Sequence, residues 1–165
     1  MCKKSEKGAV LVVSFIILVV MTVIGLAGME ITGLEEKMAG NARDRNIAFQ
    51  AAEAALREGE DYLESQVLLP AFDGSQGLYA LTTDGTKNWE GVTWTNGSQV
   101  RLANTGINGL AATPAYIIES LESAGADDSL EVGGAKGATN FYRITARAVG
   151  QTDSAEVILQ SVYKR

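Results

Sequence analysis

The sequence predicts an α+β fold, in which one long N-terminal helix packs on a small antiparallel β-sheet. One observation is a segment from Gly8 to Met29 without any charged side chain, whose helical pattern continues into an alanine-rich, charged segment. The other is a change from Pro70 onward to short segments with period-two alternation, separated by turn sequences. We therefore expect four regions in the 165 residues: a basic N-terminus, the apolar and amphipathic halves of the helix, and a β-rich head, at 1–8, 9–29, 30–68 and 69–165.

The apolar half of the helix has the length of a membrane span. Ala9 to Gly28 contains 20 residues, about 30 Å as a helix, which matches the hydrocarbon thickness of a bilayer. Three lysines precede this segment and three glutamates follow it, so the positive-inside rule places the N-terminus in the cytoplasm and the rest outside. A secretory signal, with Gly25-Leu26-Ala27 as its cleavage site, is an alternative, but the apolar run is too long for it. The charged residues are Lys3, Lys4, Lys7, Glu30, Glu35 and Glu36.

The helical pattern does not stop at the membrane boundary. Apolar residues recur at helical spacing after it, and the segment from Arg43 to Glu58 is rich in strong helix formers. Pro70 is a natural stop, so the expected helix runs from Ala9 to Leu68. Four glycines, each costing about 1 kcal/mol relative to alanine, make its middle weak. They are Gly25, Gly28, Gly33 and Gly40.

Small residues form one stripe along the amphipathic half. Such a stripe permits close approach either of another helix or of the chain's own sheet, and we favour the sheet because the head needs a helix on which to pack. The stripe comprises Ala48, Ala52, Ala55, Gly59, Leu63 and Val67.

The clearest strands lie at the end of the chain. Residues 141–149 and 155–163 alternate with period two, and the short link Gly150-Gln151-Thr152-Asp153 predicts an antiparallel hairpin. Earlier strand candidates are Leu78 to Thr83, Val92 to Thr95, Gln99 to Ala103 and Tyr116 to Leu121. Turn signals between them are Asp84-Gly85, Asn96-Gly97, Asn108-Gly109 and Gly133-Gly134.

Composition argues against catalysis and against nucleic-acid binding. The net charge is −6, which argues against a basic surface that could bind phosphates. There is no histidine, so the commonest general base and metal ligand is missing. The single cysteine, Cys2, cannot form an intramolecular disulfide. We expect no cofactor, no metal and no enzymatic activity, because no nucleophile stands beside an obvious base.

Three features of the head could suggest ligands, but each has a simpler interpretation. Trp89 and Trp94 flank Gly91 and could form a recognition patch, although core packing is favoured for large aromatic side chains in a small sheet. The triplet 96–98 has the glycosylation pattern, and we interpret it as a hairpin turn. A third group is acidic, but its spacing fits no standard calcium loop, so we interpret it as a solvated turn. This group is Asp127, Asp128 and Glu131.

Two parts of the sequence resemble a known family. The basic leader ending in Lys7-Gly8 and the apolar helix after it resemble a class III prepilin, and Met38 to Leu56 (MAGNARDRNIAFQAAEAAL) resembles the N-terminal signature of PilX-type minor pilins of the type IV pilus. The resemblance runs from Lys7 to about Glu60 and weakly through the final two strands. It implies a type IV pilin-like fold and a minor pilin that acts in pilus assembly, in a priming or tip complex, and hence in adhesion and twitching motility.

The resemblance also implies specific site residues. Prepilin peptidase would cut after Gly8 and methylate the new terminus at Ala9, which stands where major pilins usually have phenylalanine. The fifth residue after the cut is a glutamate in most type IV pilins, where it neutralises the amine of the subunit ahead; here it is Val13. A carboxylate in lipid is costly unless it is paired. A subunit without this carboxylate cannot pair with the terminal amine of a subunit ahead of it, which suits it to the tip.

The implied partners follow from this assignment. They are other minor and major pilins through the N-terminal helix, prepilin peptidase, the inner-membrane assembly platform, and membrane lipid before assembly. The implied location is the inner membrane, single-pass with a periplasmic head, and then the extracellular pilus. Candidates for pairing between neighbouring stems are Glu30, Glu35, Glu36 and Lys37.

Other assignments stay open at this point. A minor pseudopilin of type II secretion would have the same stem, although capping pseudopilins usually carry a larger head. A single-span membrane-anchored periplasmic binding or sensor module, or more distantly an anchored enzyme, would share only the hydropathy pattern.

Overall fold

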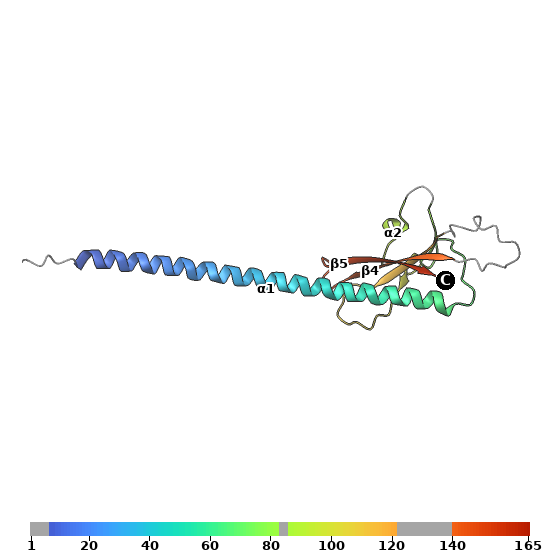
Figure 1. Cartoon of the computed structure of the whole chain (residues 1–165), viewed down its shortest axis with the longest axis horizontal. Helices are drawn as coiled ribbons and strands as arrows, with labels where there is room; N and C mark the ends of the chain where they lie inside the picture. The colour runs from blue at the N-terminus through green and yellow to red at the C-terminus, as the bar shows by residue number, and fades with distance from the viewer. Residues whose placement is uncertain (1–6, 83–85, 122–139) are drawn as a thin grey trace, which may run out of the picture. The chain divides into compact units, whose positions relative to one another are not determined.

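The computed structural model describes residues 7–82, 86–121 and 140–165. Its elements are α1 (Lys7–Ser65), β1 (Leu78–Ala80), α2 (Asn88–Gly91), β2 (Arg101–Leu102), β3 (Ala115–Leu121), β4 (Phe141–Val149) and β5 (Glu156–Lys164) (Figure 1). They confirm the α+β class. The chain divides into two compact units, Met1–Ala42 and Arg43–Arg165, and each is described by itself below.

Helix α1 is one continuous helix of 59 residues. It begins at Lys7, two residues before the predicted start, and ends at Ser65, before the predicted end at Leu68. The Ser65 hydroxyl donates to the carbonyl of Tyr62 at 3.1 Å, within the last turn of the helix. The assignment of Val67 to the buried stripe is therefore wrong, because Val67 follows the helix and its side chain is 97% exposed.

The sheet of the second unit is mixed rather than antiparallel. Its order is β1-β3-β4-β5, and β2 also pairs with β3. The pairs β3–β4 and β4–β5 are antiparallel as predicted, whereas β1 runs parallel to β3. Parallel neighbours need a long crossover, and the chain between β1 and β3, which contains α2 and β2, supplies it. Alternation of apolar and polar residues indicates which face of the sheet a residue occupies, but it does not indicate the direction of the neighbouring strand. The parallel pair was therefore not predicted.

The final hairpin is confirmed almost to the residue. β4 and β5 pair from Phe141↔Lys164 to Val149↔Glu156, and the Gly150 amide donates to the carbonyl of Ala155 at 2.9 Å across the turn.

Of the earlier strands, two are shorter than predicted and one is a residue longer. β1 ends at Ala80, β2 covers only Arg101–Leu102, and β3 gains Ala115 at its start. The predicted strand Val92 to Thr95 is wrong. Its backbone instead forms local bonds: the Asn96 amide donates to the carbonyl of Thr93 at 2.9 Å, and the Thr93 amide donates to the side chain of Gln99.

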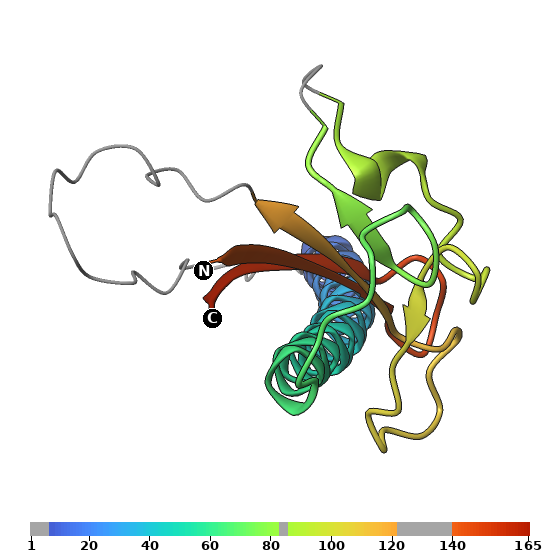
Figure 2. The ribbon, with the colours of Figure 1, turned by 90° about the vertical axis from the view of Figure 1, so that its right-hand side faces the viewer.

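The stripe of small residues packs on the chain's own sheet, as favoured from the sequence. Ala55 and Leu63 join Ile118 and Ile144 in the main core cluster, and Ala52 packs with a second cluster nearer the hairpin turn. All five side chains have no exposed surface. Figure 2 shows this part of α1 against one face of the sheet.

The opposite face of the sheet is covered by the segment between β1 and β2. Trp89 and Trp94 are half-buried and pack against Val100, Ala115 and Ile117. The core interpretation of the two tryptophans is therefore confirmed. Burial on this face also explains the short α2, since it carries Trp89 onto β3.

The predicted turns have mixed outcomes. Asn96 accepts hydrogen bonds from the amide and hydroxyl of Ser98 at 3.1 and 2.8 Å, so the triplet is a turn, but no strand precedes it and it is not a hairpin turn. Gly109 takes the left-handed conformation at φ 81°. The signals at 84–85 and 133–134 and the acidic group at 127–131 lie outside the described residues.

Candidate functional site

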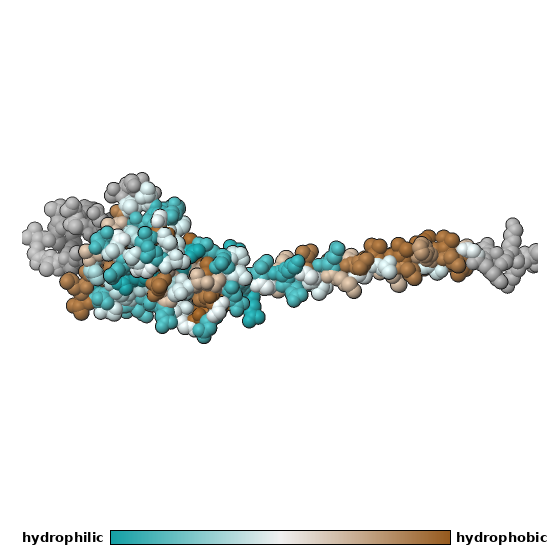
Figure 3. All heavy atoms as spheres, turned by 180° about the vertical axis from the view of Figure 1, so that it is seen from behind, coloured by the Kyte–Doolittle hydropathy of each residue, from teal (hydrophilic) through white to brown (hydrophobic). Residues whose placement is uncertain are grey.

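The first unit presents an uninterrupted apolar surface. Every described residue from Gly8 to Met29 is exposed, with Val10 at 70% and Met29 at 75%. Figure 3 shows these hydrophobic residues gathered along the N-terminal part of α1. The helix is long and apolar enough to cross a membrane. An apolar surface of this extent marks contact with lipid or with another protein.

Polar groups within this apolar segment are satisfied by the helix itself. The Ser14 hydroxyl donates to the carbonyl of Leu11 at 3.0 Å, and the Thr22 hydroxyl donates to the carbonyl of Val19 at 2.8 Å. The backbone of the segment is helical throughout. Beyond the first turn of α1, no backbone group and neither of these two hydroxyls therefore needs water, which is the condition for residence in lipid.

The predicted processing and assembly residues lie at the start of this surface. Gly8 and Ala9 are exposed in the first turn of α1. Val13 follows one turn after Ala9, on the same face of the helix, and is 54% exposed. Gly25 and Gly28 are helical, and no other heavy atom lies within 4 Å of where a Cβ would stand. Their role as weak points stays a prediction.

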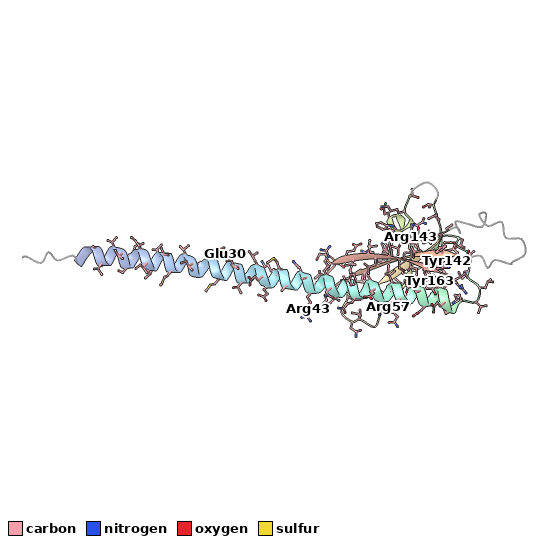
Figure 4. All side chains as sticks on the ribbon, in the orientation of Figure 1. Glu30, Arg43, Arg57, Tyr142, Arg143 and Tyr163 are labelled. Atoms are coloured by element: carbon pink, nitrogen blue, oxygen red, sulfur yellow. The ribbon has the colours of Figure 1, made fainter. Side chains whose placement is uncertain are left out.

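A charged segment follows the apolar one. Its four predicted pairing residues are all exposed, and Figure 4 shows the Glu30 side chain projecting from α1. None of them has an ion pair among the residues that the structure describes. They are Glu30, Glu35, Glu36 and Lys37.

Within the second unit, the part of α1 from Arg43 to Ser65 is hydrogen-bonded to the final hairpin near each of its two ends. Near its start, the Asp44 carboxylate accepts from the amides of Gln151 and Thr152 and from the Thr152 hydroxyl. The Thr152 hydroxyl bond, together with these amides, holds the pKa of Asp44 below its usual range, against a smaller effect of desolvation. A Cβ on Gly150 would stand 2.1 Å from the Asp44 carboxylate oxygen, so only glycine fits there.

Near the end of α1, strand β5 donates to helix carboxylates. The Ser161 hydroxyl donates to Glu60 at 3.1 Å, and the Tyr163 hydroxyl donates to Glu64 at 2.6 Å. Figure 4 shows Tyr163 beside the helix. These bonds, like the Asp44 bonds, join residues about a hundred positions apart, so no local sequence signal could have found them.

Two family models match this chain. The model described as "PilX N-terminal" matches residues 7–57, and "Type IV pilus assembly protein PilX C-term" matches residues 57–165. The chain belongs to the PilX family. The matches run from the start of α1 through β5, so they also cover the head, where the sequence resemblance was weak. Comparison with curated proteins and with solved structures gave no match.

Membership in the PilX family makes this chain a minor pilin related to type IV pilus assembly. The family is a structural component of the pilus and not a known enzyme family, and its role implies contact with other pilus components. The long apolar helix of this PilX-family chain fits a single-pass membrane anchor.

The described parts of this PilX-family protein contain no arrangement suited to metal chemistry. No group of three or more potential metal ligands occurs among them. The buried carboxylate of Glu119 accepts from the side-chain amide of Asn88 at 2.9 Å and lies 3.6 Å from the Arg143 guanidinium. It ties α2 to the sheet and is part of the packing of the head. No local sequence signal marks this carboxylate, because its partners lie more than 20 residues away in the chain.

Proposed function

We propose that this PilX-family chain is a minor pilin that primes assembly and occupies the tip of the type IV pilus, and so contributes to adhesion and twitching motility. The observation that carries the proposal is the exposed apolar surface of α1, which no described part of the chain covers. Lipid covers it while the subunit waits in the inner membrane. Stems of neighbouring pilins cover it in the fibre, so it is never transferred to water.

Processing would convert the stored subunit into one that can polymerise. In the proposal, prepilin peptidase removes residues 1–8 and methylates Ala9, and the inner-membrane assembly platform then extracts the subunit. The lysines before the apolar segment hold the N-terminus in the cytoplasm and leave the head in the periplasm. After extraction, the head lies on the extracellular pilus. The exposure of Gly8 and Ala9 supports access by the peptidase.

Val13 is the basis for the tip position. An apolar side chain at this place cannot neutralise the terminal amine of a subunit ahead, and that amine would remain charged in the apolar fibre core. Growth below this subunit has no such cost, because its own amine can pair with the glutamate of the next pilin. The chain is therefore suited to be first and unsuited to internal positions.

The processing step is tested by the intact mass of the chain from membranes and from sheared pili. We expect the wild-type chain to lack residues 1–8 and to carry one additional methyl group. Gly8→Val should retain the leader and stay in the membrane, whereas the control Gly25→Val, also on exposed helix, should be processed normally. Full-length chain in the pilus fraction would refute the proposal.

The tip position is tested by Val13→Glu, with labelled subunits located on pili by microscopy. The restored carboxylate should allow the subunit to enter the shaft. Val12→Glu is the matched control, since it adds the same charge to an exposed neighbouring position on a different face. If Val13→Glu leaves the wild-type location unchanged, the argument from the missing glutamate is wrong.

A further inference from the structure

A pocket of about 520 Å³ lies in the second unit, between α1 and the segment that leads into β2. Glu58 of α1 and Arg101 of β2 line it, together with Tyr116 of β3. The rest of the lining is Gln76, Gly97, Ser98, Val100 and Leu102. The pocket is separate from the apolar surface of α1 on which the proposed function rests.

Arg101 differs from three other arginines of α1 and the sheet. Arg57, Arg143 and Arg147 each pair with a glutamate, whereas Arg101 has no ion pair among the described residues. Its Nε atom is buried without a hydrogen-bond partner. Buried polar groups are nearly always paired, so this donor indicates an acceptor that the chain itself does not supply.

The guanidinium of Arg101 is held in a fixed plane. Its Cζ atom lies 3.8 Å from the ring centroid of Tyr62, a distance typical of a stacked cation–π contact. The guanidinium also forms a side-chain hydrogen bond with Tyr116. The remaining N–H groups, among them the unpaired Nε–H, can donate to the oxygens of a carboxylate.

Backbone strain occurs at the same pocket. Gln76 has φ 49°, the one positive φ at a non-glycine residue among those that the structure describes. Its amide donates to the carbonyl of Ser98 at 2.7 Å, which holds the strained conformation. Such strained residues gather at binding sites, where their surroundings enforce the conformation. The strain places the Gln76 side chain in the lining beside the turn that precedes β2.

We propose that this pocket binds a carboxylate carried by an extended polypeptide segment of a partner protein. A single carboxylate fits better than a phosphate or a polyanion, because Glu58 lies in the same pocket and the chain carries a net charge of −6.

A polypeptide is favoured over a sugar for two reasons. In the described part of the chain, β2 pairs with β3 alone, so its second edge can bond an extended main chain. Leu102, 49% exposed beside that edge, offers apolar contact to the residue next to the acid.

The test uses the full-length chain in detergent micelles and follows the Arg101 Nε–Hε resonance by NMR. The probe is N-acetyl-Asp-Leu-amide, and we expect saturable binding that is about tenfold or more tighter than that of N-acetyl-Asn-Leu-amide, the value of one charged hydrogen bond. Inorganic phosphate and N-acetylneuraminic acid should bind more weakly than the aspartyl peptide. Equal binding of the asparaginyl peptide, or tighter binding of phosphate or of the sugar, overturns the proposal.

Variants assign the binding to Arg101. Arg101→Gln should abolish binding, and Arg57→Gln, which removes an exposed arginine of α1, should leave it unchanged. Because Arg101→Gln also removes the contact with Tyr62, Glu58→Gln supplies a second measurement. The glutamine removes the negative charge and keeps a side-chain oxygen that can accept from the Asn104 amide, as Glu58 does. Binding of the aspartyl peptide should then become several-fold tighter. If Arg101→Gln binds as wild type, or Glu58→Gln weakens binding, the proposal is wrong. Since the readout is binding to the isolated chain, it is independent of whether the chain primes a pilus.

Discussion

Gly59 is a position where α1 packs closely on the sheet, and it allows a sharp test of the packing. A Cβ at this position would stand 2.8 Å from Cγ2 of Ile144 and 3.2 Å from the Tyr116 ring. Ile144 is fully buried in β4, and its Cγ2 is fixed directly to its Cβ, so it cannot move aside as the end of a long side chain could. Gly59→Ala must therefore shift the helix relative to the sheet.

Two effects of opposite sign decide the magnitude. Alanine is favoured over glycine by about 1 kcal/mol in a helix. Forcing an extra carbon into a well-packed core costs about 1–3 kcal/mol. The contact at 2.8 Å indicates that overpacking prevails, so the net loss in the free energy of unfolding should be about 0–2 kcal/mol.

Urea unfolding of the full-length chain in detergent, followed by tryptophan fluorescence, measures this effect. Both tryptophans of the chain pack on the sheet, so the signal reports the second unit. Gly40→Ala is the control, because nothing lies within 4 Å of its Cβ position, and it should not lower the midpoint. A Gly59→Ala variant more stable than wild type would refute the close helix–sheet contact.

Three further predictions use the same unfolding assay. Leu63→Ala removes a fully buried side chain and should cost about 2–5 kcal/mol; a loss below 1 kcal/mol would show that this end of α1 is not packed as described. Glu119→Ala removes one of the two acceptors of the Asn88 side-chain amide, which keeps its bond to the Ala80 carbonyl, and leaves Arg143 without its carboxylate. It should cost about 1–3 kcal/mol, with a neutral result contradicting the role of that carboxylate. The hydrogen bond from Thr152 lowers the pKa of Asp44, so its stabilisation is present above about pH 4 and is lost as pH falls further. Asp44→Asn should therefore be less stable than wild type at pH 7, and the difference should shrink between about pH 5 and pH 3; an unchanged difference would exclude Asp44 as its source.

The two proposals concern different surfaces, one apolar and one polar, and they can therefore be tested separately. In the proposed function, the apolar surface of α1 is covered first by lipid and then by neighbouring helices. The pocket at Arg101 is polar and is built from elements of the second unit. A variant at Val13 should therefore alter placement in the pilus without altering peptide binding, and a variant at Arg101 should do the reverse.

The sequence by itself determined the parts of this protein that depend on local pattern. Helix α1 follows from the composition and periodicity of residues close together in the chain, and the final hairpin follows from alternation and a short turn. The PilX resemblance between Met38 and Leu56 is of the same kind. The membrane-length segment was predictable because hydropathy over 20 residues needs no knowledge of contacts.

Only the tertiary structure decided the features that depend on residues far apart in the chain. The parallel direction of β1, the bonds from Asp44 to the hairpin turn and the burial of Glu119 each join segments separated by dozens of residues. At Val92 to Thr95, local hydrogen bonds such as that from the Thr93 amide to the Gln99 side chain replace the predicted strand pairing. The pocket at Arg101 exists because α1, β2 and β3 meet there. The local residue pattern of a segment determines its secondary structure. How segments pack together depends on the free energy of burying them against one another, and the sequence of one segment alone does not determine it.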